Sequence, residues 1–66
     1  MAMLKVIEVL AESNKSWEDA AQVAVSTASN TVRHIKSINI KNLQATVVDG
    51  KITTYRVNAK LSFVLE

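Results

Sequence analysis

Apolar and polar residues alternate along the last quarter of the chain. From Tyr55 to Phe63 every second position is apolar, and the positions between them hold Arg56, Asn58, Lys60 and Ser62. A period of two is typical of a β-strand that buries one face and leaves the other open. We therefore expect the rest of the chain to pack against this strand, and its polar face is where function is sought.

Two elements are predicted in the first half of the chain. Residues 3–11 are apolar on both faces, which indicates a strand that is covered from both sides. A polar loop then leads to Ser16, a suitable helix N-cap. Apolar residues recur at helical spacing from Trp17 to about Lys36, and Trp17 is interpreted as a core residue. The weak helix formers around Asn30 leave a break there open.

Residues 37–48 predict the second strand. Ile38 and Ile40 share one parity, whereas Leu43, Ala45 and Val47 share the other, so we expect a β-bulge or bend at Lys41-Asn42. Asp49-Gly50 then predicts a type I′ hairpin turn, because both central residues of that turn need positive φ.

The predicted element order is β-α-β-β, in a single domain that spans residues 1–66. The hairpin makes the second and third strands antiparallel neighbours, and the first strand is expected on the other side of the third. The fold class is therefore α+β, a three-stranded antiparallel sheet with one helix on one face.

Composition favours self-association over a lone monomer. A chain of sixty-six residues buries so little surface on folding that its free energy of unfolding is expected to be marginal. Small domains usually rely on disulfides, metals or oligomerisation for additional stability. The chain has no cysteine and one histidine, His34, which excludes disulfides and a zinc site built by one chain. An apolar fraction of 48% exceeds what one small core hides, so a subunit interface is expected.

Several function classes are disfavoured. The net charge of +2 comes from scattered residues, whereas nucleic-acid binders cluster basic side chains, so no nucleic-acid partner is expected. No stretch suits a membrane span and the first residues do not resemble a signal peptide, so the default location is cytoplasmic. No glycine elbow, cysteine nucleophile or glycine-rich phosphate loop is found, and the protein is not expected to be an enzyme.

Two groups of residues together resemble the dodecin family of small flavin-binding proteins. The first is Lys5-Val6-Ile7-Glu8 followed by Ser16-Trp17-Glu18-Asp19-Ala20-Ala21, and the second is Asp49-Gly50-Lys51, Tyr55, Val57, Phe63 and Leu65-Glu66. The resemblance covers nearly the whole chain. It implies the fold above, with the sheet wrapped around the helix, and a homododecamer that forms a hollow shell with pairs of flavins at two-fold subunit contacts.

The resemblance also assigns three flavin-site positions, all of them substituted here. Ser37 stands where flavin-binding members have a Trp that stacks on the isoalloxazine ring. Arg56 replaces a Gln that hydrogen-bonds the ring edge, and Gln44 replaces an Arg that many members carry. Serine offers no stacking surface, and Arg only donates hydrogen bonds. A second interpretation of Arg56 is an ion pair on the strand face with a Glu.

These departures predict a non-enzymatic dodecin-like shell protein that binds or buffers a small molecule or ion, with a degraded flavin-stacking site. The ligand expectations are FMN or riboflavin with weak affinity, or calcium, since a calcium-containing form is among the Trp-less dodecin-like proteins. The metal ligands are unassigned, because the acidic residues lack EF-hand spacing. The alternatives are a flavin storage and sequestration protein, or a structural or protein-interaction assembly without a small ligand.

Overall fold

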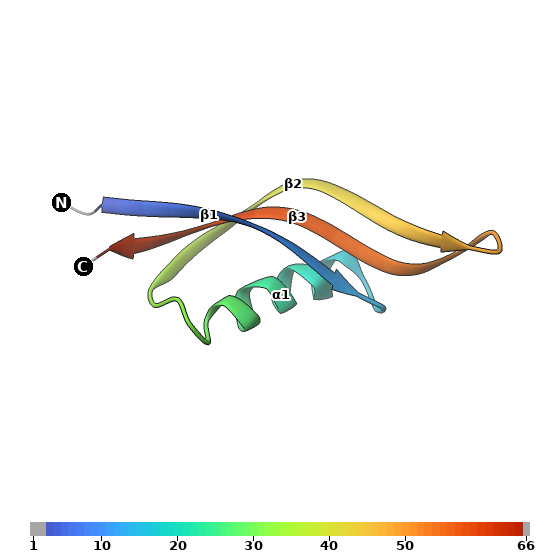
Figure 1. The fold of residues 1–66 in the computed structure, drawn as a ribbon, viewed down its shortest axis with the longest axis horizontal. Coiled ribbons are helices and arrows are strands. Elements are labelled where there is room, and N and C mark those ends of the chain that lie inside the picture. Colours follow the sequence, from blue (N-terminus) through green and yellow to red (C-terminus); the bar gives the residue numbers. More distant parts are fainter. Residues whose placement is uncertain (1–2, 66) are drawn as a thin grey trace.

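The computed structural model describes residues 3–65 and contains three strands and one helix (Figure 1). Their order is β1 (Met3–Ser13), α1 (Trp17–Ala28), β2 (Ile35–Val48) and β3 (Lys51–Leu65). The predicted β-α-β-β order and α+β class are confirmed. No helix within this part of the chain is long and apolar enough to cross a membrane.

The three strands form one antiparallel sheet in the order β1-β3-β2, as predicted. The long strand β3 therefore has a hydrogen-bonded neighbour on each edge. The helix lies against one face of the sheet, mainly over β1 and β3 (Figure 1). Every second residue in the middle of β3 faces this helix and is fully buried, namely Val57, Ala59 and Leu61.

The core depends on small residues of α1. Ala20 and Ala24 are buried against Ala11 of β1 and Val57 of β3. Alanine side chains let the helix backbone approach the sheet closely, so even a short helix can cover the buried residues of β3. Trp17 is partly buried and packs at the edge of this cluster, in agreement with its interpretation as a core residue.

The helix begins as the sequence predicts. The Ser16 side chain accepts a hydrogen bond from the Asp19 backbone N–H at 2.9 Å, which satisfies one of the free donors of the first turn. The Ser13 hydroxyl donates to the Asp19 carboxylate at 2.6 Å. The end of β1 and the start of α1 are thus joined by side chains.

The predicted helix end near Lys36 is wrong, because α1 ends at Ala28, close to the break around Asn30 that the weak helix formers left open. The Val25 carbonyl accepts from both the hydroxyl and the N–H of Ser29, at 2.7 and 2.9 Å, and the Asn30 N–H then donates to the Thr27 carbonyl at 3.2 Å, the tighter spacing typical of a helix end. His34 then adopts a left-handed backbone with φ 60°, which a continuing helix does not allow. Strand β2 begins two residues earlier than predicted, because Ile35 pairs with Phe63.

The β2–β3 pairing is interrupted where the apolar parity changes. The register shifts between Ile40 and Asn42, so the predicted bulge at Lys41-Asn42 is confirmed. Further shifts lie at Ile35/Ser37 and Thr46/Val47. The residues left without a register partner are Lys36 and Lys41 of β2 and Thr53 of β3, and such irregularities are typical of β-bulges.

The β2–β3 hairpin extends beyond the helix and makes the molecule elongated, with extents of 51 × 20 × 13 Å (Figure 1). Asp49 and Gly50 have φ values of 51° and 74°, as the predicted type I′ turn requires. Apolar side chains remain exposed along this arm, namely Leu43, Val47, Val48 and Ile52. A monomer therefore leaves much of its apolar surface in water.

Gly50→Ala is expected to lower the free energy of unfolding by about 1 kcal/mol, because a Cβ disfavours the left-handed backbone at this residue. No atom lies within 4 Å of the added Cβ, so the loss comes from the backbone alone. Urea unfolding at fixed protein concentration measures it.

Gly50→Asn is the matched control, since Asn tolerates positive φ. Its unfolding midpoint should lie between those of the wild type and Gly50→Ala. Equal midpoints for the two variants would contradict the backbone explanation.

Candidate functional site

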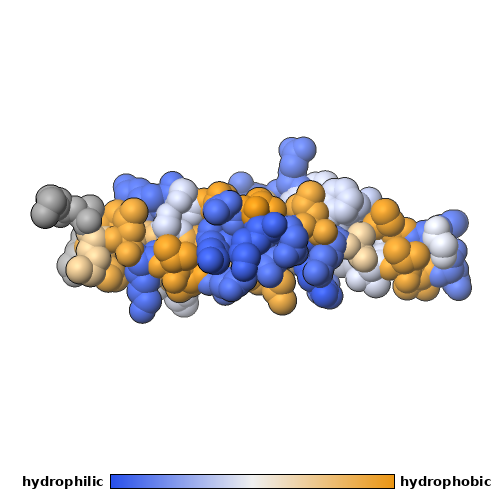
Figure 2. All heavy atoms as spheres, turned by 90° about the horizontal axis from the view of Figure 1, so that it is seen from above, coloured by the Kyte–Doolittle hydropathy of each residue, from blue (hydrophilic) through white to orange (hydrophobic). Residues whose placement is uncertain are grey.

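The face of the sheet opposite α1 carries most of the candidate site residues, and we call it the open face. Figure 2, which views the molecule from this side, shows hydrophilic groups gathered at the centre with hydrophobic groups between and beyond them. On β3 the open face presents Arg56, Asn58, Lys60 and Ser62, because the alternate positions face the helix. Neighbouring residues on β1 and β2 follow from the strand register.

Arg56 lies in a row that crosses all three strands. Its register partners are Glu12 on β1 and Gln44 on β2. Both Nε and Nη2 of Arg56 donate to Oε1 of Glu12, at 3.0 and 2.6 Å. The interpretation of Arg56 as a strand-face ion pair with a Glu is confirmed, and the partner belongs to the same chain. Gln44 and Arg56 are therefore brought together.

Ser37 lies far from this row. It pairs with Ser62, and the two hydroxyls are hydrogen-bonded to each other. Six positions of β3 separate Ser62 from Arg56, which corresponds to about 20 Å along a strand. Within one chain Gln44 lies opposite Arg56, whereas Ser37 lies far from both. A site that used all three positions would therefore need a second copy of the chain.

A second pair of charged side chains lies near Lys60 of β3, the register partner of Glu8. Lys41, the bulge residue, donates to Oε2 of Glu8 at 3.1 Å. The hydrogen bond and charge of Lys41 hold the pKa of the Glu8 carboxyl below its ordinary value of 4.5, and Lys60 and Asn58 act in the same direction. The other amide atom of Asn58, Oδ1, is buried without a hydrogen-bond partner.

Trp17 supports the site from the opposite face of the sheet. Its ring meets Tyr55 edge to face, with centroids 4.9 Å apart and an interplanar angle of 76°. Its Nε1–H donates to the Gln44 backbone carbonyl at 2.8 Å. The helix start thereby holds β2 beside Tyr55, and the ring is engaged in this packing rather than available on the open face.

The described residues of one chain do not gather a metal site. No three His, Cys, Asp or Glu side chains within residues 3–65 lie close enough together to hold an ion. Glu8 and Glu12 are each engaged by a basic side chain. Calcium bound at these carboxylates would have to compete with Lys41 and Arg56.

Sequence reasoning did not identify Glu12 as the partner of Arg56. In an antiparallel strand pair the residue numbers of opposite positions add up to a constant, so the register of the first and third strands would have identified Glu12. That register could not be predicted from the sequence, since no short turn joins these two strands. The Lys41–Glu8 pair was missed for a related reason, because the bulge moves Lys41 out of regular alternation.

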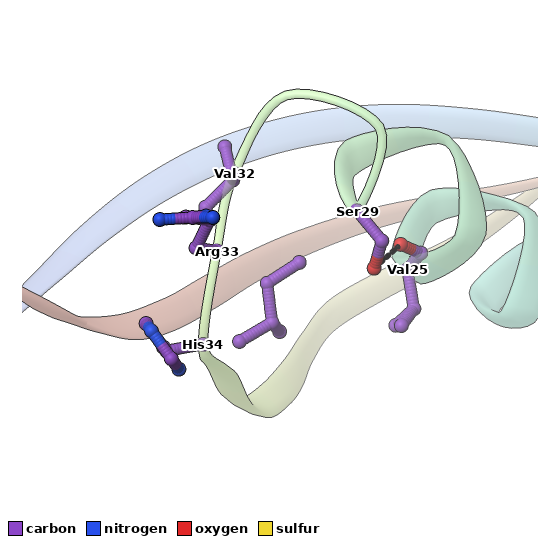
Figure 3. Close-up of a pocket in the computed structure, with 6 residues that line it drawn as sticks. Val25, Ser29, Val32, Arg33 and His34 are labelled. Carbon is purple, nitrogen blue, oxygen red and sulfur yellow. Dashed lines mark hydrogen bonds between the residues drawn. The ribbon is translucent and has the colours of Figure 1, made fainter.

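Two hollows adjoin the connector between α1 and β2. One is lined by Val25, Ser29, Val32, Arg33, His34 and Ile35 (Figure 3). The other is lined by Thr31, Val32, Arg33, His34, Phe63, Val64 and Leu65. A third, more apolar hollow lies between α1 and β1.

A family model described as Dodecin matches residues 3–66 of this sequence. The chain belongs to the dodecin family. This agrees with the resemblance drawn from the sequence motifs.

Two curated dodecins are similar over almost their whole length. A dodecin of Thermus thermophilus is 29% identical over 94% of this chain and 90% of the relative. A calcium dodecin of Mycobacterium tuberculosis is 33% identical over 96% of this chain and 89% of the relative.

Solved dodecin structures share the fold. The dodecin of Streptomyces coelicolor superposes with a TM-score of 0.95 and 29% identity, covering 98% of this chain and 93% of that one. The M. tuberculosis calcium dodecin is described as calcium chelating with a novel calcium-binding site. It superposes with a TM-score of 0.83 and 35% identity, covering 97% of this chain and 91% of that one.

Lys41→Gln is expected to return the pKa of Glu8 towards 4.5, because it removes the main group that favours the carboxylate. Since the folded-state pKa is lowered, the pair stabilises the fold above pH 4.5 and the stabilisation fades as pH falls through the lowered pKa. NMR titration of the Glu8 carboxyl measures the change. Lys51→Gln, which removes the same charge from the hairpin, should leave this titration unaltered, and an equal shift in both variants would argue against the Lys41 contact.

Proposed function

We propose that this dodecin is a non-enzymatic protein that assembles into a homododecameric shell and binds or buffers a small molecule or ion at subunit contacts. In this proposal the flavin-stacking site is degraded. The observation that carries it is the Glu12–Arg56–Gln44 row, in which a paired cation occupies the position where flavin-binding members carry a neutral Gln.

The chemistry of this row disfavours tight flavin binding. A Gln offers both a donor and an acceptor to a ring edge, whereas Arg56 only donates. Its Nε–H and one Nη2–H already go to Glu12. Ser37 adds no ring on which the isoalloxazine could stack, and its hydroxyl is engaged by Ser62. A flavin would lose both its stacking partner and its acceptor.

The shape and surface of the chain support self-association. The chain exposes 4850 Å², whereas a compact monomer of 7.2 kDa exposes about 4,100 Å². Large apolar side chains are exposed on β1 and on the hairpin, among them Leu10 at 65%. Exposed apolar surface of this kind is typical of protein interfaces.

Two alternatives use the same assembly. Flavin storage with FMN or riboflavin is favoured by the relation to dodecins, and calcium buffering by the similarity to a calcium dodecin. A purely structural or protein-interaction assembly needs neither ligand, and it fits the paired state of Glu12 and Glu8 equally well.

Wild-type protein at micromolar concentration is expected to quench riboflavin or FMN fluorescence only weakly. The double variant Ser37→Trp/Arg56→Gln restores a stacking ring and an edge acceptor, so its flavin affinity should rise at least about ten-fold, the effect of ~1.4 kcal/mol. Fluorescence titration of each protein measures the change.

The matched control is Asn39→Trp/Arg56→Gln, which places a ring elsewhere on the open face of β2 and should gain little. Strong quenching by the wild type would overturn the degraded-site proposal. An equal gain in the control would show that any exposed ring suffices.

Native mass spectrometry is expected to show twelve chains of 7.2 kDa, a particle of about 86 kDa. A monomer at micromolar concentration would contradict the assembly.

In the same experiment calcium is added at millimolar concentration. Discrete mass increments on the intact particle would favour the calcium alternative, and an unchanged mass would argue against it.

A further inference from the structure

The hollow between α1 and the outer edge of β1, the edge away from β3, is mostly apolar. We call it the edge groove, and it is lined by Val9, Leu10, Ala11, Glu12, Val23, Ala24, Thr27 and Ala28. Among these residues only Glu12 is charged, and its carboxylate is already paired with Arg56 at 2.6 Å. A partner that covers the groove would therefore not bury an unpaired charge of its lining.

The hairpin arm, residues 45–54, presents an apolar surface on the side of the sheet where α1 lies. Val47 and Ile52 are register partners, so their side chains lie on the same face. Leu43, four residues before Val47 on β2, pairs with the buried Val57, so this face is the helix side. Val47 is 61% exposed and Ile52 is 51% exposed, because α1 does not extend below them.

The arm of a chain cannot fill the edge groove of the same chain. At the start of α1, Trp17 donates to the Gln44 carbonyl, and the helix runs from there away from the hairpin (Figure 1). Ala24 lies seven residues along α1, about 10 Å from Trp17. Val47 lies three residues beyond Gln44 in the other direction, about 10 Å along the strand. The two surfaces are thus about 20 Å apart.

The exposed area fits a second copy of this chain as the occupant. The chain exposes 4850 Å², about 700 Å² more than a compact monomer of its mass. This excess is close to the ~800 Å² that one partner contributes to a standard protein interface. Each copy carries one arm and one groove, so a contact between copies covers both surfaces at once.

We propose that the helix side of the hairpin arm of one copy packs into the edge groove of a second copy. This inference rests on the proposed assembly and identifies one of its contacts. Because arm and groove are different surfaces, the contact is heterologous and repeats head to tail until it closes a ring. It is distinct from the two-fold contacts that the family resemblance implies, and the two types together can build a closed shell.

Val47→Glu and Val23→Glu are each expected to remove the twelve-chain particle from the native mass spectrum and to leave smaller species. Each variant places a carboxylate without a partner in the contact. Both side chains are exposed in the single chain, at 61% and 38%, so the chain should still fold, and far-UV circular dichroism checks this. Val48→Glu is the matched control, because Val48 lies on the opposite face of the arm, and it should keep the particle.

The outcomes separate this contact from the assembly itself. A wild type without twelve chains would contradict the proposed assembly. A twelve-chain wild type together with a twelve-chain Val47→Glu particle would overturn the arm contact alone. If the groove instead held a small apolar ligand or a different protein, Val23→Glu would keep its twelve chains, and this too would overturn the proposal.

Cross-linking tests the contact without disrupting it. The sequence has no cysteine, so Val47→Cys and Val23→Cys introduce the only thiols. With a short bismaleimide, linked dimers are expected when the two variants are co-expressed, and few when either is expressed alone. Co-expression of Val48→Cys with Val23→Cys should give few linked dimers. Equal linking of Val47→Cys with itself would indicate a symmetric contact, and either that result or no linking in the mixture would overturn the proposal.

Discussion

Hydrogen bonding of β3 along both of its edges is the constraint on which the structure depends. The backbones of β1 and β2 are not hydrogen-bonded to each other, so β3 alone joins the two strands into a sheet. The helix then covers the middle of β3, where Val57 and Leu61 are fully buried. Both the core and the open face follow from this arrangement, because alternate residues of one strand serve the two faces.

The local features of the fold could be predicted from sequence because each rests on a few neighbouring residues. The Ser16 cap, the Asp49-Gly50 turn and the bulge near Lys41 are of this kind, and all three are present. The end of the helix was predictable only in part. The weak helix formers around Asn30 left a break open, but apolar spacing continues to Lys36, and the pairing of β2 with β3 from Ile35 on is not visible in the local sequence.

The candidate site was predictable only in part, since its contacts join distant segments. Counting from the turn pairs Gln44 with Tyr55, the chain neighbour of Arg56, and the register shift at Thr46/Val47 then brings Gln44 opposite Arg56. Glu12 enters the same row through the β1–β3 register, which no short connection determines. Ser37 lies about 20 Å away from Arg56 along the sheet, a distance that becomes evident only when the strands are paired. The flavin-site assignment of these three positions stays a prediction.

The Glu12–Arg56 pair also limits how this face of the sheet can change by mutation. Replacing Glu12 alone would leave a lone cation in the central row, and replacing Arg56 alone would leave a lone carboxylate at one end of it. The two residues therefore constrain each other's replacement, and a dodecin that carries one of them is expected to carry the other.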